Sequence, residues 1–317
     1  MNANIEHVIQ GHHQVIVIGQ TGMGKSTLIN TWLSHDQERT YNNPVIAIPM
    51  EHYPTGDPNF RNRVSTENDP NNQMSSQTNK CSIYTMKNIQ VIDTPGFADS
   101  NGSDKDKVNL KLIEKVIMDR GYITAVVLLL DGTRNRMTPQ DQYVINSVRG
   151  LFPDKLLENL VIVFTRCRSR LSLRYPLKDF CQNVAVPQKT LCLDNVVLGT
   201  NPNMWKGNLD LERQLKKEWK AAMFSMAQLS GIFDALAPVS NNVFKEYSEI
   251  RQRGMAKIDS IMTDIKNLSQ LKRQLTAIIV DEEAARLTVD EYNKKITETS
   301  VAKIRWINDD SKGHSTV

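Results

Sequence analysis

The sequence predicts an α/β protein with a doubly wound, mostly parallel sheet and a C-terminal helical extension. Two observations predict the sheet. Short segments that are apolar almost throughout alternate with helical patterns, as expected for parallel strands covered on both faces. The polar motifs follow those segments, at the strand ends where doubly wound sheets bind their ligands. With 317 residues, 40% of them hydrophobic, the chain is long enough for one large domain and an extension.

The first element is a predicted strand at residues 14–18, which leads through a glycine loop into a predicted helix at residues 26–33. The loop fits G-x-x-x-x-G-K-[ST], the phosphate-binding P-loop. Its glycines let backbone N–H groups face a phosphate, Lys25 is expected to reach the β- and γ-phosphates, and Ser26 is expected to ligate Mg²⁺. The residues predicted to hold the nucleotide here are Gly19, Gln20, Thr21, Gly22, Met23, Gly24, Lys25, Ser26 and Thr27.

A polar, proline-rich segment follows at residues 36–79, with a short strand expected at residues 45–48. Loops of this length inside a domain are usually functional. A strand pair is predicted next, at residues 82–86 and 89–93, across a tight turn at Lys87-Asn88.

The second motif, D-x-x-G, runs from Asp93 to Gly96 at the carboxyl end of the second strand of that pair. An aspartate at this point is expected to hold Mg²⁺ through water. Gly96 has no side chain, so its N–H can approach a γ-phosphate closely. Together with the glycine loop, this motif favours a P-loop GTPase over a P-loop ATPase.

The spacing of apolar residues and the turn residues predict the other helices and strands before residue 244. A helix at residues 108–120 presents an apolar side that includes Val108 and Leu112, and Pro139 after Thr138 starts another helix. Residues 168–207 show no clear pattern beyond one short helix. The other predicted elements are strands at residues 123–130, 160–166 and 232–237, and a helix at residues 209–230.

From Phe244 onward the composition changes, because prolines vanish and charged residues dominate. We therefore expect two domains, a nucleotide-binding domain at 10–243 and a helical extension at 244–310. Apolar residues of the extension recur every three or four positions, which predicts a long amphipathic helix. That helix either packs on its own domain or pairs with a partner helix in a coiled coil. The basic and aromatic residues around Trp306 leave open a peripheral contact with a membrane surface.

Charge, cysteine content and hydropathy bear on three further properties: nucleic-acid binding, cellular compartment and membrane insertion. The net charge of +4 is mild and the basic residues are dispersed, so no nucleic-acid partner is expected. The four cysteines show no C-x-x-C spacing, and no signal peptide is evident, which predicts reduced thiols in a cytoplasmic protein. The most apolar run, residues 123–130, is too short to span a bilayer.

These motifs resemble those of the immunity-associated GTPase family, the GIMAP/IAN or AIG-type proteins, in the septin and Toc branch of P-loop GTPases. The likeness runs from about residue 15 to residue 244, and its R-x-T element is absent from Ras-like proteins. The residues that carry it are, in order, Gly24-Lys25-Ser26, Thr78-Asn79-Lys80-Cys81, Asp93-Thr94-Pro95-Gly96, Arg136-Met137-Thr138, Phe164-Thr165-Arg166 and Asn241-Asn242.

The resemblance implies a protein that binds GTP or GDP with Mg²⁺, forms a nucleotide-dependent homodimer, and acts as a scaffold or switch near intracellular membranes. It implies slow GTP hydrolysis, in which Thr78 and an Arg136 supplied across the dimer take part. The residues that it assigns to Mg²⁺ are Ser26, Thr78 and Asp93. The residues that it assigns to the nucleotide beyond the glycine loop are Gly96, Thr165, Arg166 and Asn241.

Two positions bear on specificity and turnover. Arg168 stands where the family has a carboxylate that reads guanine, and arginine cannot accept hydrogen bonds. Phe97 follows Gly96 at the position where Ras-like enzymes have a water-orienting glutamine. Two alternatives to a slow GTPase therefore stay open: a nucleotide-dependent binding module with negligible turnover, and an NTPase with relaxed base specificity.

Overall fold

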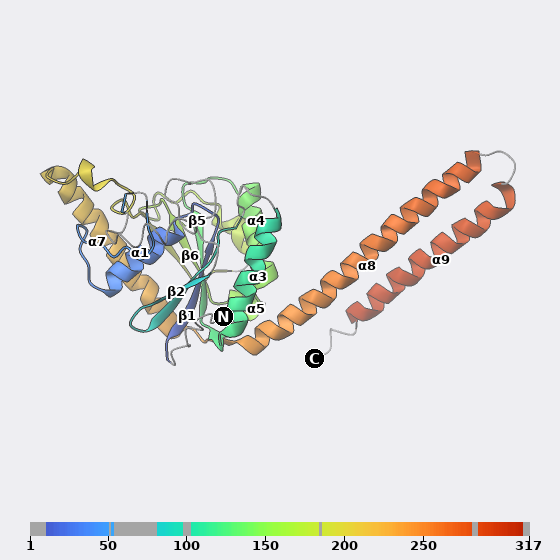
Figure 1. Cartoon of the computed structure of the whole chain (residues 1–317), viewed down its shortest axis with the longest axis horizontal. Helices are drawn as coiled ribbons and strands as arrows, with labels where there is room; N and C mark the ends of the chain where they lie inside the picture. Colours follow the sequence, from blue (N-terminus) through green and yellow to red (C-terminus); the bar gives the residue numbers. More distant parts are fainter. Residues whose placement is uncertain are drawn as a thin grey trace, which may run out of the picture. The chain divides into compact units, whose positions relative to one another are not determined.

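The computed structural model describes residues 11–50, 52–53, 81–97, 103–183, 186–280 and 285–312 (Figure 1). The chain divides into a first unit, residues 1–248, and a second unit, residues 249–317. The first unit is a layered α/β domain, and the second consists of helices. None of the described helices is long and apolar enough to cross a membrane.

The first unit is organised around a sheet of six strands in the order β2-β3-β1-β5-β6-β7. Neighbouring strands are parallel except β2, which pairs antiparallel with β3. The doubly wound, mostly parallel sheet that the sequence predicts is therefore confirmed. Its strands are β1 (His13–Gly19), β2 (Ser82–Thr85), β3 (Ile89–Asp93), β5 (Ala125–Asp131), β6 (Leu160–Thr165) and β7 (Lys189–Leu193).

Helices cover both faces of this sheet (Figure 1). Each central strand supplies two cores, because successive side chains of a strand point to opposite faces. In β1, Val15 and Val17 pack with α1 and α7, whereas Ile16 and Ile18 pack with α3, α4 and α5. The helices of this unit are α1 (Lys25–Asp36), α3 (Ser103–Asp119), α4 (Pro139–Leu151), α5 (Asp154–Leu157), α6 (Leu177–Asn183) and α7 (Leu209–Ile232).

The apolar run at residues 123–130 forms two strands rather than the one predicted. Ile123 belongs to β4 (Tyr122–Ile123) and pairs with Val239 of β8 (Val239–Ser240) in a separate two-stranded sheet. Thr124 turns back toward β1, where its N–H donates to the Gln14 carbonyl at 2.7 Å and its hydroxyl accepts from the Gln14 N–H at 3.1 Å. Both pieces are buried, so hydropathy alone does not reveal the break.

The strand predicted at residues 232–237 is wrong. α7 continues to Ile232 and ends in a 3-10 turn, Phe233–Ala235. Phe233 is buried and stacks on Trp32 of α1, with the ring centroids 5.7 Å apart. A short apolar run does not distinguish a strand from the end of a buried helix. Here the run ends a helix, because its apolar side chains pack on α1 together with those of α7.

The last strand of the sheet is instead β7, within the region where the sequence predicted no strand. Only Leu191 and Leu193 of this edge strand are buried, so it lacks the apolar run of its neighbours. The strand expected at residues 45–48 is also wrong. There the Asn30 side chain replaces a strand partner, because its Oδ1 accepts from Ala47 N–H and Ile48 N–H and its Nδ2 donates to the Ile48 carbonyl.

The helix predicted at residues 108–120 exists as α3, but its buried side is displaced from the expected one. Asn109, Ile113 and Ile117 are buried, whereas Val108 is 56% exposed. The buried asparagine explains the shift, because its Nδ2 donates to the Gly96 carbonyl at 3.1 Å. A polar residue therefore occupies the buried side that the apolar pattern assigned to Val108.

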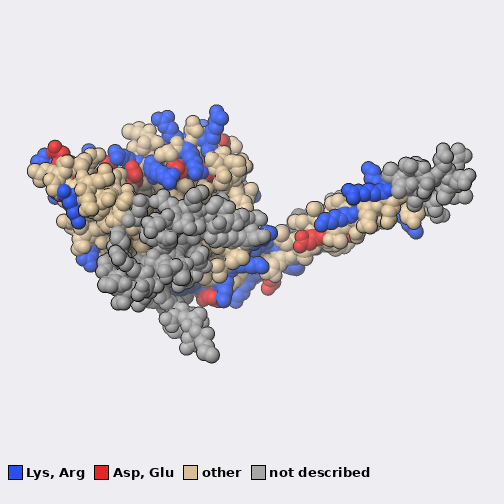
Figure 2. Space-filling view, turned by 45° about the horizontal axis from the view of Figure 1, so that its top comes forward, with Lys and Arg blue, Asp and Glu red and all other residues tan. Residues whose placement is uncertain are grey.

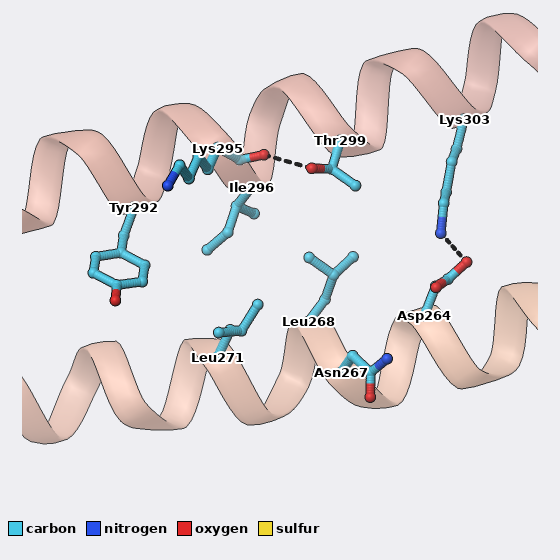
Figure 3. Close-up of a pocket in the computed structure, with 9 residues that line it drawn as sticks. All are labelled: Asp264, Asn267, Leu268, Leu271, Tyr292, Lys295, Ile296, Thr299 and Lys303. Atoms are coloured by element: carbon cyan, nitrogen blue, oxygen red, sulfur yellow. Dashed lines mark hydrogen bonds and ion pairs between the residues drawn. The ribbon is translucent and has the colours of Figure 1, made fainter.

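The second unit begins at residue 249 within α8 (Asn241–Val280), and there α8 lies beside α9 (Ala285–Lys312) in a helical hairpin (Figure 3). Leu268 and Leu271 of α8 face Ile296 of α9 across a pocket of about 330 Å³. The Lys303 ammonium pairs with the Asp264 carboxylate. The extension is thus a pair of helices that partly cover each other's apolar sides, where the sequence predicted one long helix.

Candidate functional site

The glycine loop lies at the carboxyl end of β1, directly before α1. Gly22 and Gly24 have φ angles of 78° and 86°, a region open to glycine and strained for most other residues. Gly24 immediately precedes the helix, so the free N–H groups of the first helical turn border the loop. Such a turn at a helix N-terminus is an anion-binding site.

Lys25 and Asp93 are both buried beside this loop. The Lys25 ammonium donates to the carbonyl oxygens of Gly19 at 3.2 Å and Gln20 at 3.4 Å. Burial lowers the pKa of Lys25, and the negative charge of Asp93 opposes that shift. Burial raises the pKa of Asp93 to about 6, against the opposing effects of Lys25 and of a backbone hydrogen bond from Thr94.

The D-x-x-G segment packs directly against the glycine loop. The Thr21 N–H donates to the Phe97 carbonyl at 3.1 Å, and the Phe97 N–H donates to the Gly19 carbonyl at 3.3 Å. A Cβ atom on Gly96 would lie 2.3 Å from the Thr21 hydroxyl oxygen and 2.9 Å from Thr21 Cα. Only glycine fits at this contact, so the two motifs form one continuous surface.

A carboxylate at the end of β5 connects the loop to the end of β6. Arg166 donates to Asp131 Oδ2 at 2.7 Å and to the Gly22 carbonyl at 3.2 Å. Its φ of 55° is unusual for a residue other than glycine. Burial alone would raise the pKa of Asp131, but hydrogen bonds from Thr133 and Arg166 outweigh it and hold the pKa below its usual value. Asp131 is therefore an ionised anchor that orients Arg166 toward the loop.

Two arginines follow β5, and their surroundings differ. Arg134 donates to Asp141 Oδ1 at 2.7 Å and to Gln20 Oε1 at 3.4 Å, which ties it to α4 and to the glycine loop. Arg136 is exposed and makes no hydrogen bond or ion pair with the part of the chain that the structure describes. Thr138 caps α4 in a capping box with Asp141. Of these two arginines, Arg136 is therefore the one that the described residues leave unengaged.

The ends of β6 and β7 carry a charged group that the sequence analysis missed. Arg168 Nε donates to Asp194 Oδ2 at 3.3 Å, and Arg168 Nη1 lies 3.5 Å from Glu218 Oε1 of α7. Asn195 is buried and donates through Nδ2 to the Thr31 hydroxyl of α1. Asp194 and Asn195 directly follow the unpredicted β7, and the change from apolar to polar residues after Leu193 was the available signal.

Basic side chains gather at the carboxyl edge of the sheet. Figure 2 turns the top of Figure 1 forward and shows Lys and Arg on that face, with acidic side chains among them. A positive edge attracts anionic ligands such as phosphates. The segments after β5 and β6 supply Arg134, Arg136, Arg166, Arg168, Arg170 and Arg174.

The predicted site residues divide into three groups by position. The loop residues 19–27 lie together with Asp93, Gly96, Thr165 and Arg166, and a Cβ on Gly24 would be 3.9 Å from Thr165 Cγ2. Thr78 lies outside the described residues. Asn241 lies elsewhere, so its assignment to the base is corrected.

Asn241 is held at the opposite edge of the sheet from the glycine loop. Its N–H donates to the Gly121 carbonyl at 3.0 Å, and its Nδ2 donates to the Met118 carbonyl at 3.3 Å. Both partners precede β4, on the amino side of the strands, whereas the loop follows the carboxyl end of β1.

The residues present fit a nucleotide with Mg²⁺. Asp93 Oδ1 and the Thr21 hydroxyl are buried without hydrogen-bond partners in the described part of the chain, which leaves polar atoms unsatisfied beside the loop. Oxygen atoms of this kind suit Mg²⁺. The described residues contain no cluster of three or more His, Cys, Asp or Glu side chains.

Comparisons with known proteins agree on one family. A model of the AIG1 family matches residues 13–191. The chain is 29% identical to immune-associated nucleotide-binding protein 13 of Arabidopsis thaliana over 131 residues, which cover 39% of this chain and 38% of that protein. It is 27% identical to GTP-binding protein A of Dictyostelium discoideum over 163 residues, which cover 51% of this chain and 30% of that protein. The chain therefore spans about a third of the length of these two relatives.

Among solved structures, the chain is similar to Toc33 from Arabidopsis thaliana in complex with GDP and Mg²⁺. That match has 15% sequence identity and a TM-score of 0.38, and it covers 67% of this chain and 84% of Toc33.

Proposed function

The chain belongs to the AIG1 family, and we propose that it binds a guanine nucleotide with Mg²⁺ at the carboxyl edge of the sheet and hydrolyses GTP slowly. The observation that carries this proposal is the contact between the glycine loop and the D-x-x-G segment, which brings Lys25, Asp93 and Gly96 into one site. The names of the relatives, nucleotide-binding protein and GTP-binding protein, support the ligand class.

Each part of the site has one task in this proposal. The N–H groups of the loop and the Lys25 ammonium bind the phosphates, while Gly96 offers its N–H to the terminal phosphate. The Ser26 and Thr78 hydroxyls ligate Mg²⁺ and Asp93 holds it through water. When bound, Mg²⁺ neutralises charge on the phosphates.

Slow turnover follows from the residue after Gly96. Phe97 is fully buried in the core beneath the sheet edge, so it offers no polar group to orient an attacking water. Phosphoryl transfer depends on positioning and charge neutralisation, and this chain supplies only part of both. Phe97 equally favours a second candidate function, a nucleotide-dependent binding module with negligible turnover. Single-turnover GTP hydrolysis at high protein concentration distinguishes such a module from a slow GTPase.

We further propose that two copies associate across this edge when GTP is bound, so that Arg136 of one copy reaches the phosphates held by the other. Arg136 suits this role because it is exposed and unpaired within the described chain, whereas Arg134 is engaged by Asp141 and Gln20. An arginine supplied in trans is worth about 10³ to 10⁵ in rate in related chemistry.

The test of nucleotide binding is calorimetric titration of the native protein and of Lys25→Ala with GTP, GDP and ATP in the presence of Mg²⁺. Loss of the buried ammonium should weaken GTP binding by about 100-fold or more, because it removes a charge-assisted contact to phosphate. Lys87→Ala is the matched control, since Lys87 is 72% exposed on the β2–β3 turn and should leave affinity unchanged. Native affinity for GTP in Lys25→Ala would overturn the proposal.

A further inference from the structure

Guanine recognition needs an acceptor that this chain does not have at the expected position. The Watson–Crick edge of guanine offers two adjacent donors, N1–H and the 2-amino group, and one carboxylate can accept from both. Arg168 occupies the position where such a carboxylate is expected, and a guanidinium only donates. A base reader must therefore come from another element if guanine is bound, so this inference rests on the proposed function.

The strand that lies beside β6 brings a carboxylate to the same place. β6 and β7 are parallel neighbours, with Thr165 opposite Leu193. The residues that follow these two strands therefore leave the sheet side by side. Asp194 is the first residue after β7, and its side chain is 28% exposed. Strand order thus puts Asp194 next to the Arg166–Arg168 segment, although the two are far apart in sequence.

Arg168 orients this carboxylate and leaves part of it available. Arg168 Nε donates to Asp194 Oδ2 at 3.3 Å, and the guanidinium also meets Glu218 Oε1 at 3.5 Å. Within the described chain, Asp194 Oδ1 accepts no hydrogen bond. The arginine that disrupts the usual reading position therefore holds a replacement acceptor from the neighbouring strand.

The segment that carries Asp194 is fixed relative to the phosphate loop. The next residue, Asn195, donates to the Thr31 hydroxyl of α1 and accepts from the Leu198 N–H at 3.3 Å. α1 begins at Lys25, and Arg166 at the end of β6 donates to the Gly22 carbonyl. Asn195, next to Asp194, and Arg166, two residues before Arg168, are thus hydrogen-bonded to α1 and to the glycine loop, which would hold the phosphates.

From this geometry we propose that Asp194 is the carboxylate that accepts the N1–H and 2-amino protons of guanine, and that Arg168 is the residue that positions it. Specificity for guanine is transferred from the segment after β6 to the segment after β7. The charge of Arg168 is then a requirement for base choice, and it acts through Asp194 without touching the base.

The test changes the hydrogen-bonding groups on both sides of the proposed contact, at position 194 of the protein and at C2 of the base. Xanthine carries a C2 carbonyl in place of the 2-amino group of guanine, so an asparagine amide, which both accepts and donates, matches xanthine as a carboxylate matches guanine. Asp194→Asn should bind GTP about 10- to 100-fold more weakly than the native protein and bind xanthosine triphosphate correspondingly better. Calorimetric titration of the full chain with GTP, xanthosine triphosphate and ATP measures both changes.

Three further variants separate base reading from structural damage. Asp210→Asn is the matched control, because Asp210 also pairs with an arginine, Arg213, yet lies at the start of α7 and is 91% exposed. It should keep the native ratio of GTP to xanthosine triphosphate affinity. Arg168→Ala should lower the ratio of GTP to ATP affinity without changing ATP affinity, and Arg168→Lys should restore part of that ratio.

The outcomes distinguish this inference from the proposed function. Native protein that binds GTP, together with an Asp194→Asn variant that keeps the native preference among the three nucleotides, overturns the role of Asp194 alone. Equal weakening of all three nucleotides in Asp194→Asn also overturns it, since it would indicate a structural effect. Native protein that binds none of them overturns both the inference and the proposed function.

Discussion

Gly96 illustrates how strongly one residue can be constrained by a contact distant in sequence. Its missing side chain matters less for backbone freedom than for space, because the Thr21 backbone and hydroxyl occupy the position of a Cβ atom. The sequence motif assigned the glycine to approach of a phosphate. The structure adds that the same glycine lets the D-x-x-G segment touch the glycine loop at all.

Gly96→Ala should therefore separate the two motifs. A methyl group within 2.9 Å of the Thr21 backbone forces one segment to move, and overpacking of this kind costs roughly 1–3 kcal/mol. We expect about a tenfold or greater loss of GTP affinity, measured by calorimetry. Gly150→Ala in α4 is the control, because open space surrounds that position and alanine favours a helix. Native affinity in Gly96→Ala would show that the contact is dispensable.

At the scale of elements, the α8–α9 hairpin is held by a narrow set of contacts. Leu268 and Ile296 face each other between the helices, and the Asp264–Lys303 pair lies at one end of the pocket between them (Figure 3). Ile265 is only one turn from Leu268 but is 50% exposed. The two aliphatic residues thus provide an inward and an outward position on the same helix.

Leu268→Asp should open the hairpin, and Ile265→Asp should not. A carboxylate at the inward position would replace the aliphatic side chain that faces Ile296 by a charged group between the helices, which costs about 2 kcal/mol or more. We expect at least about tenfold faster amide hydrogen exchange in α9 for Leu268→Asp. Equal exchange in the two variants would contradict packing between the helices at Leu268.

At the scale of the whole molecule, the proposed reaction depends on more than one copy. A single chain lacks a water-orienting glutamine beside Gly96, and its exposed Arg136 points to no partner among the described residues. If the second copy supplies the missing positive charge, hydrolysis must depend on protein concentration in a way that binding does not.

Specific GTP turnover should rise with protein concentration in the native protein and stay low at every concentration in Arg136→Ala. Nucleotide affinity should remain near native in that variant, because Arg136 contacts none of the loop residues of its own chain. Arg213→Ala, which removes an 80% exposed arginine on α7, should behave as the native protein. Turnover that is independent of concentration, or full activity in Arg136→Ala, would rule out the trans role.

Much of the first unit could be predicted because its signals are local. The buried strands, the glycine loop and the start of α4 at Thr138 each depend on residues close in sequence. The failures occurred where local pattern carries little information. β7 is a partly exposed edge strand, and the run at 232–237 is an apolar segment that the end of a helix uses equally well.

The sequence by itself determined the fold class, the phosphate-binding loop and the D-x-x-G segment, since glycine geometry and hydrophobic periodicity act over a few residues. Only the tertiary structure decided which polar groups meet. Strand order brings Asp194 to Arg168 and takes Asn241 to the opposite edge. Local packing binds Arg134 to Asp141, whereas Arg136 has no partner among the described residues. The physical reason is that side chains distant in sequence converge only through strand pairing and helix packing.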